Sequence, residues 1–361
     1  MTLPPTTPNC RVRRAHRNIK RCVGRTLHLC LIALLCAFGV ASFAHAGIAD
    51  QYPGDVGIEN HPDVIFVENF EEASIDALGA RWEDVVGQGL MSFSADRPAG
   101  SGGNQSVLFN GGAHLYRRLA PGYDQLYVRF YAKFDPACSN VHHFVHLGGY
   151  NPTTRWPQGG AGLRPAGNER WTTGIEPYGT EWRWDFYSYW MEMRSWQTPE
   201  GLPDGRPSPY YGNAFLRAGA EASWGPIGPA VVRGEWASVE AMVKMNDPVS
   251  ARNGEQTLWI NGQIVRHQGQ DISRLGSGFP NGSWLRDKWS PNPAGAPFEG
   301  FRWRSDAALN INFLWLLHYV DTDPACAVRF DHVVVARNYI GPIATSTDTL
   351  APAAPTNLTV Q

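Results

Sequence analysis

The chain has 361 residues, of which 31 are basic and 33 acidic, and its formal net charge is −2. Seven basic residues and no acidic ones lie within positions 1–46, so the remainder has 24 basic and 33 acidic residues. This acidic balance argues against nucleic acid as a partner, which would favour a basic face. Glycine, proline and tryptophan are abundant and helical periodicity is nearly absent, so we expect an all-β protein.

Residues 1–46 have the three parts of a secretory signal peptide. A basic stretch is followed by an apolar stretch from about Leu27 to Phe43, which ends at the small-x-small sequence Ala44-His45-Ala46. The apolar stretch is near the lower length limit for a membrane span, and the cleavage site closes it. We therefore expect cleavage, a secreted or periplasmic location, and no membrane association afterwards.

Four of the six cysteines lie in the predicted signal peptide. Cys138 and Cys326 remain, and each ends an Asp-Pro-Ala-Cys sequence. Two cysteines in an oxidising compartment predict one disulfide bond, and two free buried thiols are the alternative.

Segments with the two-residue alternation of strands follow one another from residue 63 onward. They predict strands at 63–70, 105–109, 114–119, 125–134, 141–147, 182–193, 235–245, 256–261, 311–319 and 328–336. Asn261-Gly262 between two such segments predicts a hairpin. Glycine, proline, asparagine and aspartate separate the strands, which indicates an antiparallel β-sandwich.

The domain organisation follows from these segments. We expect one β-sandwich domain over 47–343, with an extended lead-in at 47–62 and a disordered tail or linker at 344–361. Two long irregular segments, 151–181 and 195–233, are predicted to lie over the groove, because loops of this length usually carry function. We expect the protein to be a monomer.

The segment 182–193, WRWDFYSYWMEM, predicts a strand with two different faces, because successive side chains point to opposite sides. One face is apolar and suits a core. The other carries Arg183, Asp185, Tyr187 and Tyr189. This set suits a sugar-binding groove, since phenols both stack and form hydrogen bonds, and ordinary cross-strand decoration is the alternative.

Three histidines, His142, His143 and His146, lie within one predicted strand. In a strand, His142 and His146 would stand about 13 Å apart at roughly 3.3 Å per residue, and His143 would face the other way. This spacing argues against a shared metal ion and favours proton transfer by His146, with His142 in support; ordinary hydrogen-bonded strand histidines are the alternative. His318 is a further candidate because it lies near the end of a predicted strand.

The sequence lacks the motifs of several other enzyme classes. The chain has no Glu-x-Asp-x-x-Glu strand of the laminarinase-type hydrolases, no Gly-x-Ser-x-Gly elbow and no phosphate-binding loop.

Six segments, in order, resemble the strands of the concanavalin A-like jelly-roll polysaccharide lyases, and most closely those of family 14, which act on alginate and glucuronan. The segments are FVENFEE (66–72), YVRFYAKFDP (127–136), FVHLGG (144–149), GEWASVEAMVKMN (234–246), LWINGQIV (258–265) and FDHVVVARNYIGPI (330–343). The resemblance spans about residues 63–343. It implies a jelly-roll enzyme that needs no cofactor and cleaves a uronate-containing polysaccharide by β-elimination.

The resemblance also implies roles for particular residues. The family's Tyr-x-Tyr pair matches Tyr187 and Tyr189, and the position of its lysine holds His146. β-Elimination needs a cation for the C5 carboxylate, a base for the C5 proton and an acid for the leaving oxygen. We assign these roles to Arg183, to His146 or Tyr187, and to Tyr189. The predicted substrate-binding residues are His142, Asp185, Glu176, Arg170 and His318.

Calcium is the one metal that the sequence suggests, because jelly rolls often join their first and last strands through a calcium ion. Glu68, Glu71 and Asp331 are the candidate ligands, and their oxygen atoms suit this ion.

Two other functions remain open at this point. One is a non-catalytic carbohydrate-binding module of the same fold, with tryptophan and tyrosine rings as a stacking platform. The other is a glycoside hydrolase that uses Glu176, Asp185 or Glu240.

Overall fold

The computed structural model describes residues 46–139, 141–155, 160–178, 182–193, 195, 229–269, 285–286, 290–291, 300–319 and 326–345. The predicted signal peptide, except for its last residue, and the predicted tail beyond residue 345 lie outside these ranges. Most of the predicted irregular segment 195–233 lies outside them as well. Within the described ranges, no helix is long and apolar enough to cross a membrane.

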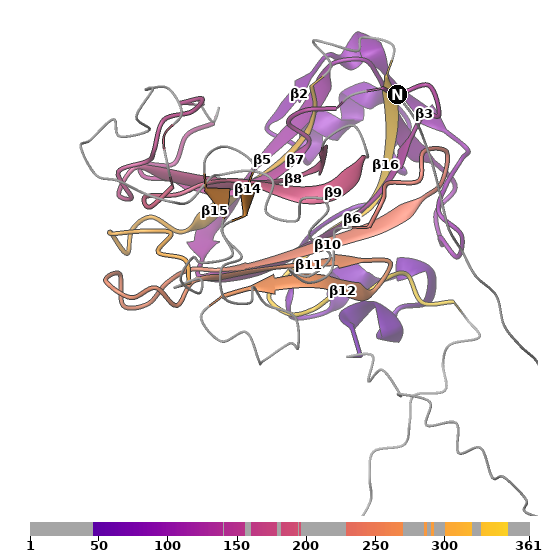
Figure 1. Cartoon of the computed structure of the whole chain (residues 1–361). Coiled ribbons are helices and arrows are strands. Elements are labelled where there is room, and N and C mark those ends of the chain that lie inside the picture. The colour runs from indigo at the N-terminus through magenta and orange to yellow at the C-terminus, as the bar shows by residue number, and fades with distance from the viewer. Residues whose placement is uncertain are drawn as a thin grey trace, which may run out of the picture. The chain divides into compact units, whose positions relative to one another are not determined.

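Two antiparallel sheets make up most of the described chain (Figure 1). The strands of the larger sheet are β1 (Val64–Glu68), β3 (Met91–Ser94), β4 (Ser106–Asn110), β6 (Gln125–Phe134), β10 (Ala237–Lys244), β11 (Glu255–Ile260), β12 (Gln263–Gln268) and β16 (Ala327–Ala336). Their order is β12-β11-β10-β6-β16-β4-β3, and β1 also pairs with β16.

The smaller sheet carries the candidate site. Its strands are β2 (Asp84–Val86), β5 (Ala113–Tyr123), β7 (Val145–Tyr150), β8 (Arg170–Tyr178), β9 (Arg183–Tyr189) and β15 (Ile311–His318). They lie in the order β2-β5-β15-β7-β8-β9. A separate short pair is formed by β13 (Leu285–Arg286) and β14 (Ser290–Pro291). The predicted antiparallel β-sandwich is confirmed.

Aromatic side chains join the two sheets in the core. Phe144, which precedes β7, stacks on Phe330 of β16 with ring centroids 5.0 Å apart. Phe134 of β6 lies 4.9 Å from Phe144 and 6.1 Å from Trp184 of β9. All four rings are buried, so they remove a large apolar area from water.

The hairpin predicted at Asn261-Gly262 is confirmed. Ile260 of β11 pairs with Gln263 of β12 across these two residues. Both turn residues have positive φ, 50° for Asn261 and 75° for Gly262, which is what a two-residue turn of type I′ requires.

The prediction of an extended lead-in at 47–62 is wrong. The structure has three short 3₁₀ helices there, η1 (Ile48–Gln51), η2 (Pro53–Asp55) and η3 (Ile58–Asn60). Their apolar side chains pack with residues of β16 and with Ile340 in a second, smaller core. The other described 3₁₀ helices are η4 (Ile75–Ala80) and η5 (Gln88–Leu90).

A buried ion pair fixes this lead-in to the larger sheet. Arg129 of β6 is fully buried and pairs with Asp55 of η2. The same guanidinium donates to the carbonyl oxygen of Gly341 at 3.1 Å, and His332 contacts the Asp55 carboxylate at 2.8 Å. Burial and the Arg129 charge act against each other on Asp55, and the net effect lowers its pKa.

Cys138 and Cys326 form the predicted disulfide bond. Both residues are fully buried, and they are separated by 188 positions in the sequence. The bond links the segment between β6 and β7 to the residue before β16. A cross-link over so long a segment removes much of the conformational freedom of the unfolded chain.

We expect the double variant Cys138→Ser, Cys326→Ser to be less stable by about 2–5 kcal/mol, because its unfolded chain regains that freedom. Thermal and urea unfolding of the two proteins measure the difference. Reduction of the parent protein with a thiol should lower its unfolding temperature to that of the variant. Equal unfolding temperatures for the oxidised parent and the variant would contradict the prediction.

Candidate functional site

Strand register places a set of polar and aromatic side chains on one face of the smaller sheet. Side chains of directly opposed residues in neighbouring strands point to the same face. Trp315, His146, Gly174 and Tyr187 follow one another across β15, β7, β8 and β9. A second row lies two residues along each strand, on the same face. It comprises Phe313, Gly148, Thr172 and Tyr189.

Two glycines in these rows make room for the neighbouring rings. A Cβ atom on Gly174 would lie 2.8 Å from Cε1 of His146, and a Cβ atom on Gly148 would lie 2.5 Å from Cζ of Phe313. Both distances are well below van der Waals contact. The imidazole of His146 therefore lies across Gly174, and the Phe313 ring lies across Gly148.

A cavity of about 450 Å³ opens over this face. Its wall includes residues of the five strands β5, β15, β7, β8 and β9 and of the segments that follow or precede them. The lining residues are His114, His143, His146, Tyr150, Gly160, Ala161, Arg170, Thr172, Tyr187, Tyr189, Phe313, Trp315, Leu317 and Tyr319.

His146 is buried in this wall, with 6% of its surface exposed. Its Nδ1 atom lies 3.4 Å from the hydroxyl of Thr172, and its Nε2 atom has no hydrogen-bond partner in the described part of the chain. Burial, together with the nearby His143 and His142, lowers the pKa of His146 well below its ordinary value. The imidazole is therefore neutral near pH 7 and able to accept a proton.

Tyr187 and Tyr189 are joined through their hydroxyl groups, whose oxygens are 2.7 Å apart. The backbone N–H of Gly162 donates to the Tyr189 oxygen at 3.0 Å. Burial raises the pKa of both phenols, and each tyrosine carries its proton near pH 7. The pair can therefore donate a proton to a bound molecule.

Arg170 supplies positive charge at the cavity wall. Its guanidinium carbon lies 5.8 Å from the centre of the Tyr189 ring, and one N–H donates to the carbonyl oxygen of Leu163 at 2.9 Å. Tyr189 thus has both the hydroxyl of Tyr187 and a cation as neighbours.

The strand predicted at 141–147 begins later than expected, because β7 starts at Val145. His143 has a φ of +60°, a left-handed conformation that is uncommon for residues other than glycine. The turn brings the rings of His142 and His143 together, with centroids 3.9 Å apart. The predicted placement of these two histidines on opposite faces of a strand is wrong.

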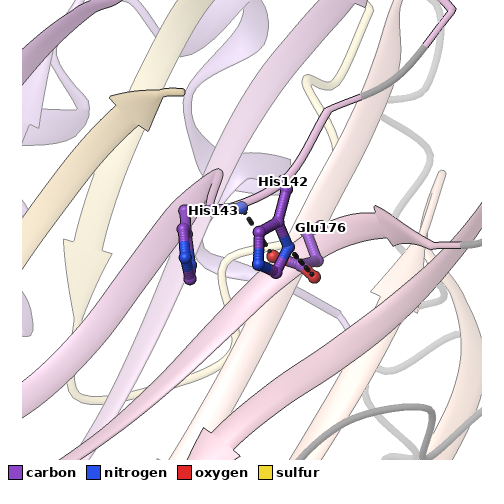
Figure 2. Close-up of side chains that lie close together, drawn as sticks. All are labelled: His142, His143 and Glu176. Atoms are coloured by element: carbon purple, nitrogen blue, oxygen red, sulfur yellow. Dashed lines mark hydrogen bonds and ion pairs between the residues drawn. The ribbon is translucent and has the colours of Figure 1, made fainter. Parts of the chain in front are cut away.

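Glu176 holds this turn (Figure 2). Its side chain is buried on β8, its Oε2 accepts the backbone N–H of His143 at 2.9 Å, and its Oε1 lies 3.3 Å from Nδ1 of His142. Asp185 lies directly opposite on β9, and its Oδ1 accepts the N–H of Phe186 at 2.7 Å. Neither carboxylate lines the cavity.

Arg183 and His318 do not line the cavity either. Arg183 begins β9 and pairs with Tyr178 and Ala230, away from the rows that form the cavity floor. His318 is fully buried, and its Nε2 lies 2.9 Å from the carbonyl oxygen of Cys326. Both lie outside the wall of this cavity, and their roles in the reaction and in substrate binding stay predictions.

Glu68 and Glu71, two of the three candidate calcium ligands, accept hydrogen bonds from different groups. Glu68 accepts hydrogen bonds from the N–H of Phe70 and the indole of Trp82, at 2.8 and 2.9 Å. Glu71 accepts the backbone N–H groups of residues 104 and 105. Among the described residues they do not form a cluster of three metal-ligand atoms with Asp331, so calcium binding stays a prediction.

Glu240, the remaining hydrolase candidate, lies on β10 in the larger sheet. Its two oxygens accept the backbone N–H groups of Ile340 and Gly341, each at 2.8 Å. Its burial, which outweighs these bonds, raises the pKa of the carboxyl to about 7. Glu240 thus holds the segment after β16 in place and is not part of the cavity wall.

Sequence reasoning missed the aromatic side of the cavity. Phe313, Trp315, Leu317 and Tyr319 belong to a stretch that is apolar at almost every position, so alternation does not reveal which residues face the groove. It also missed β8 as a strand. The polar residues Arg170, Thr172 and Glu176, spaced by even numbers of residues, are the signal that could have found it.

Comparisons with known proteins give distant likenesses. No family model and no curated protein matches the chain. A solved mutant of alginate lyase Aly36B in complex with alginate tetrasaccharide is similar, with a TM-score of 0.46, 13% identity and coverage of 77% of this chain and 98% of that one. Alginate lyase vAL-1 from Chlorella virus is similar too, with a TM-score of 0.45, 11% identity and coverage of 76% of this chain and 100% of that one.

Domain 4 of AbnA, a GH43 extracellular arabinanase from Geobacillus stearothermophilus, is also similar, with a TM-score of 0.35, 14% identity and coverage of 80% of this chain and 97% of that one. Similarities this low do not identify the function or the site residues of this chain. The family suggested by the sequence stays a prediction.

The lowered pKa of His114, in the cavity wall, predicts a dependence of stability on pH. Burial lowers the pKa of His114 to about 4, against an opposing effect of Asp84. In the unfolded chain a histidine takes up its proton near pH 6.5, so the unfolded state binds an extra proton between pH 6.5 and 4. The free energy of unfolding therefore falls as the pH drops through this window.

We expect the variant His114→Gln to lose less of its free energy of unfolding between pH 6.5 and pH 4 than the parent, as measured by urea unfolding at several pH values. Leu317→Met, in the same cavity, conserves the side-chain volume and serves as the control that keeps the parental slope. If both variants and the parent show one slope, His114 is protonated in the folded protein and the prediction is wrong.

Proposed function

We propose that the protein is a secreted lyase that binds a uronate-containing polysaccharide in this cavity and cleaves it by β-elimination. The observation that carries the proposal is the placement of His146, Tyr189 and Arg170 around one cavity. They provide the base, the acid and the cation that the reaction requires. The order of the strand segments, which resembles that of family 14 lyases, supports the same activity.

The proposed reaction uses each group once. Nε2 of His146 accepts the proton of C5, and the electron pair left on C5 forms a double bond to C4. The bond from C4 to the glycosidic oxygen breaks, and Tyr189 donates its proton to that oxygen. Arg170 pairs with the C5 carboxylate and stabilises the negative charge that develops there. Arg170 thus takes the role that the sequence analysis assigned to Arg183.

The hydrogen bonds of the site favour this assignment of acid and base. Thr172 contacts Nδ1 of His146 and so leaves Nε2 for the substrate proton. Gly162 donates to the oxygen of Tyr189, which stabilises negative charge on that oxygen after it has lost its proton. Tyr187, on its other side, can return a proton through the 2.7 Å contact.

The two alternatives are less well supported by the geometry. Glu176, Asp185 and Glu240 all accept backbone N–H groups and none lines the cavity, so a hydrolase has no acid placed there in the described chain. A binding module would use the aromatic rings of the wall for stacking. It would have no use for a buried histidine whose Nε2 carries no hydrogen bond.

The test is to incubate the protein with a panel of uronate polymers and to follow the ultraviolet absorbance of unsaturated chain ends. With the polymer that reacts, we expect Tyr189→Phe and His146→Gln to lower kcat by about 10²-fold or more, because each removes one proton-transfer group. Both variants should retain most of their affinity for the polymer. His61→Gln, which lies in the lead-in outside the cavity, should match the parent.

Three outcomes would contradict the proposal in different ways. Reducing ends without ultraviolet absorbance would indicate hydrolysis. Polymer affinity without turnover would indicate a binding module. Full activity in both cavity variants would show that the reaction occurs elsewhere.

A further inference from the structure

His142, His143 and Glu176 form a cluster (Figure 2), and His143 is also part of the cavity wall. Each offers one ligand atom, and these three atoms all lie within 4.8 Å of one another. The cluster depends on the left-handed conformation of His143, because two consecutive residues in a strand would point to opposite faces.

The distances within the cluster suit one metal ion. Nδ1 of His142 and Oε1 of Glu176 are 3.3 Å apart. Two ligand atoms bonded to one tetrahedral zinc ion, at about 2.0–2.1 Å each, are also about 3.3 Å apart. The ligand nitrogen of His143, the third ligand, lies within 4.8 Å of both of these atoms.

The chemistry of the three residues selects the class of ion. Imidazole nitrogen binds zinc and its neighbours in the first transition series, whereas calcium and magnesium prefer oxygen alone. Glu176 is buried and brings a negative charge into the cluster. The backbone N–H of His143 donates to Oε2 of Glu176 and fixes the orientation of the carboxylate. Metal-binding side chains commonly have such a hydrogen bond to a group that is not itself a ligand.

We propose that His142, His143 and Glu176 bind one zinc-class divalent cation. Two histidines and one glutamate complete three positions of a tetrahedral site and leave the fourth open. Because His143 lines the cavity, the open position adjoins the space where substrate binds. If the proposed lyase function holds, the ion at this position binds a carboxylate or hydroxyl group of the polysaccharide next to the reacting sugar.

Binding of the metal itself tests the site. The purified protein is dialysed against chelator and titrated with Zn²⁺ by calorimetry, and Co²⁺ is then added as a spectroscopic probe. We expect one equivalent of Zn²⁺ per chain and the visible absorption bands of a low-coordinate Co²⁺ ion. His142→Gln and Glu176→Gln should each weaken Zn²⁺ binding by roughly tenfold or more and change the Co²⁺ spectrum.

His61→Gln is the matched control, because it removes one histidine from outside the cluster and should leave both readouts unchanged. Circular dichroism shows whether each variant is folded. Stoichiometric binding that survives His142→Gln and Glu176→Gln in folded proteins would overturn the proposal, and so would no binding to the parent.

The metal site and the lyase function fail in different experiments. A protein that binds Zn²⁺ through these residues and cleaves no polymer keeps the site and loses the proposed function. A protein that produces unsaturated ends, binds no Zn²⁺ and is unaffected by chelator keeps the function and loses the site.

Discussion

The candidate site depends on a steric constraint in the smaller sheet, namely the missing side chains at Gly148 and Gly174. The rings of Phe313 and His146 occupy the space that Cβ atoms at these positions would need. The imidazole therefore lies low against β8, in the same row as Tyr187, rather than standing out from the sheet. The sheet surface becomes the floor of a cavity because the two glycines let these rings lie against it.

Burial at this floor separates the proton affinities of its acids and bases. The pKa of His146 falls because the charged imidazolium is poorly solvated, and the pKa of Tyr189 rises because the phenolate is poorly solvated. A proton acceptor and a proton donor thus face the same cavity, both uncharged. Arg170 adds a positive charge to the wall of this cavity.

The alternation of apolar and polar residues was sufficient to predict the sandwich and the groove-facing tyrosines of β9. It was not sufficient for β8, where Gly174 and Pro177 interrupt the pattern. It also failed at His143, because a histidine, unlike an Asn-Gly pair, does not signal a left-handed backbone conformation. Glu176 was identified as a candidate, but its hold on the histidine turn depends on contacts across 33 and 34 positions of sequence.

The disulfide bond bears on when and where such a site can form. Cys138 lies four residues before His142, and its partner Cys326 receives the contact from His318 through its carbonyl oxygen. The indole of Trp182 donates to Ser139 next to it, so the bridge anchors one end of the histidine turn. In a reducing cytoplasm this anchor is absent. The redox state of the compartment thus determines whether the covalent anchor of the histidine turn is present.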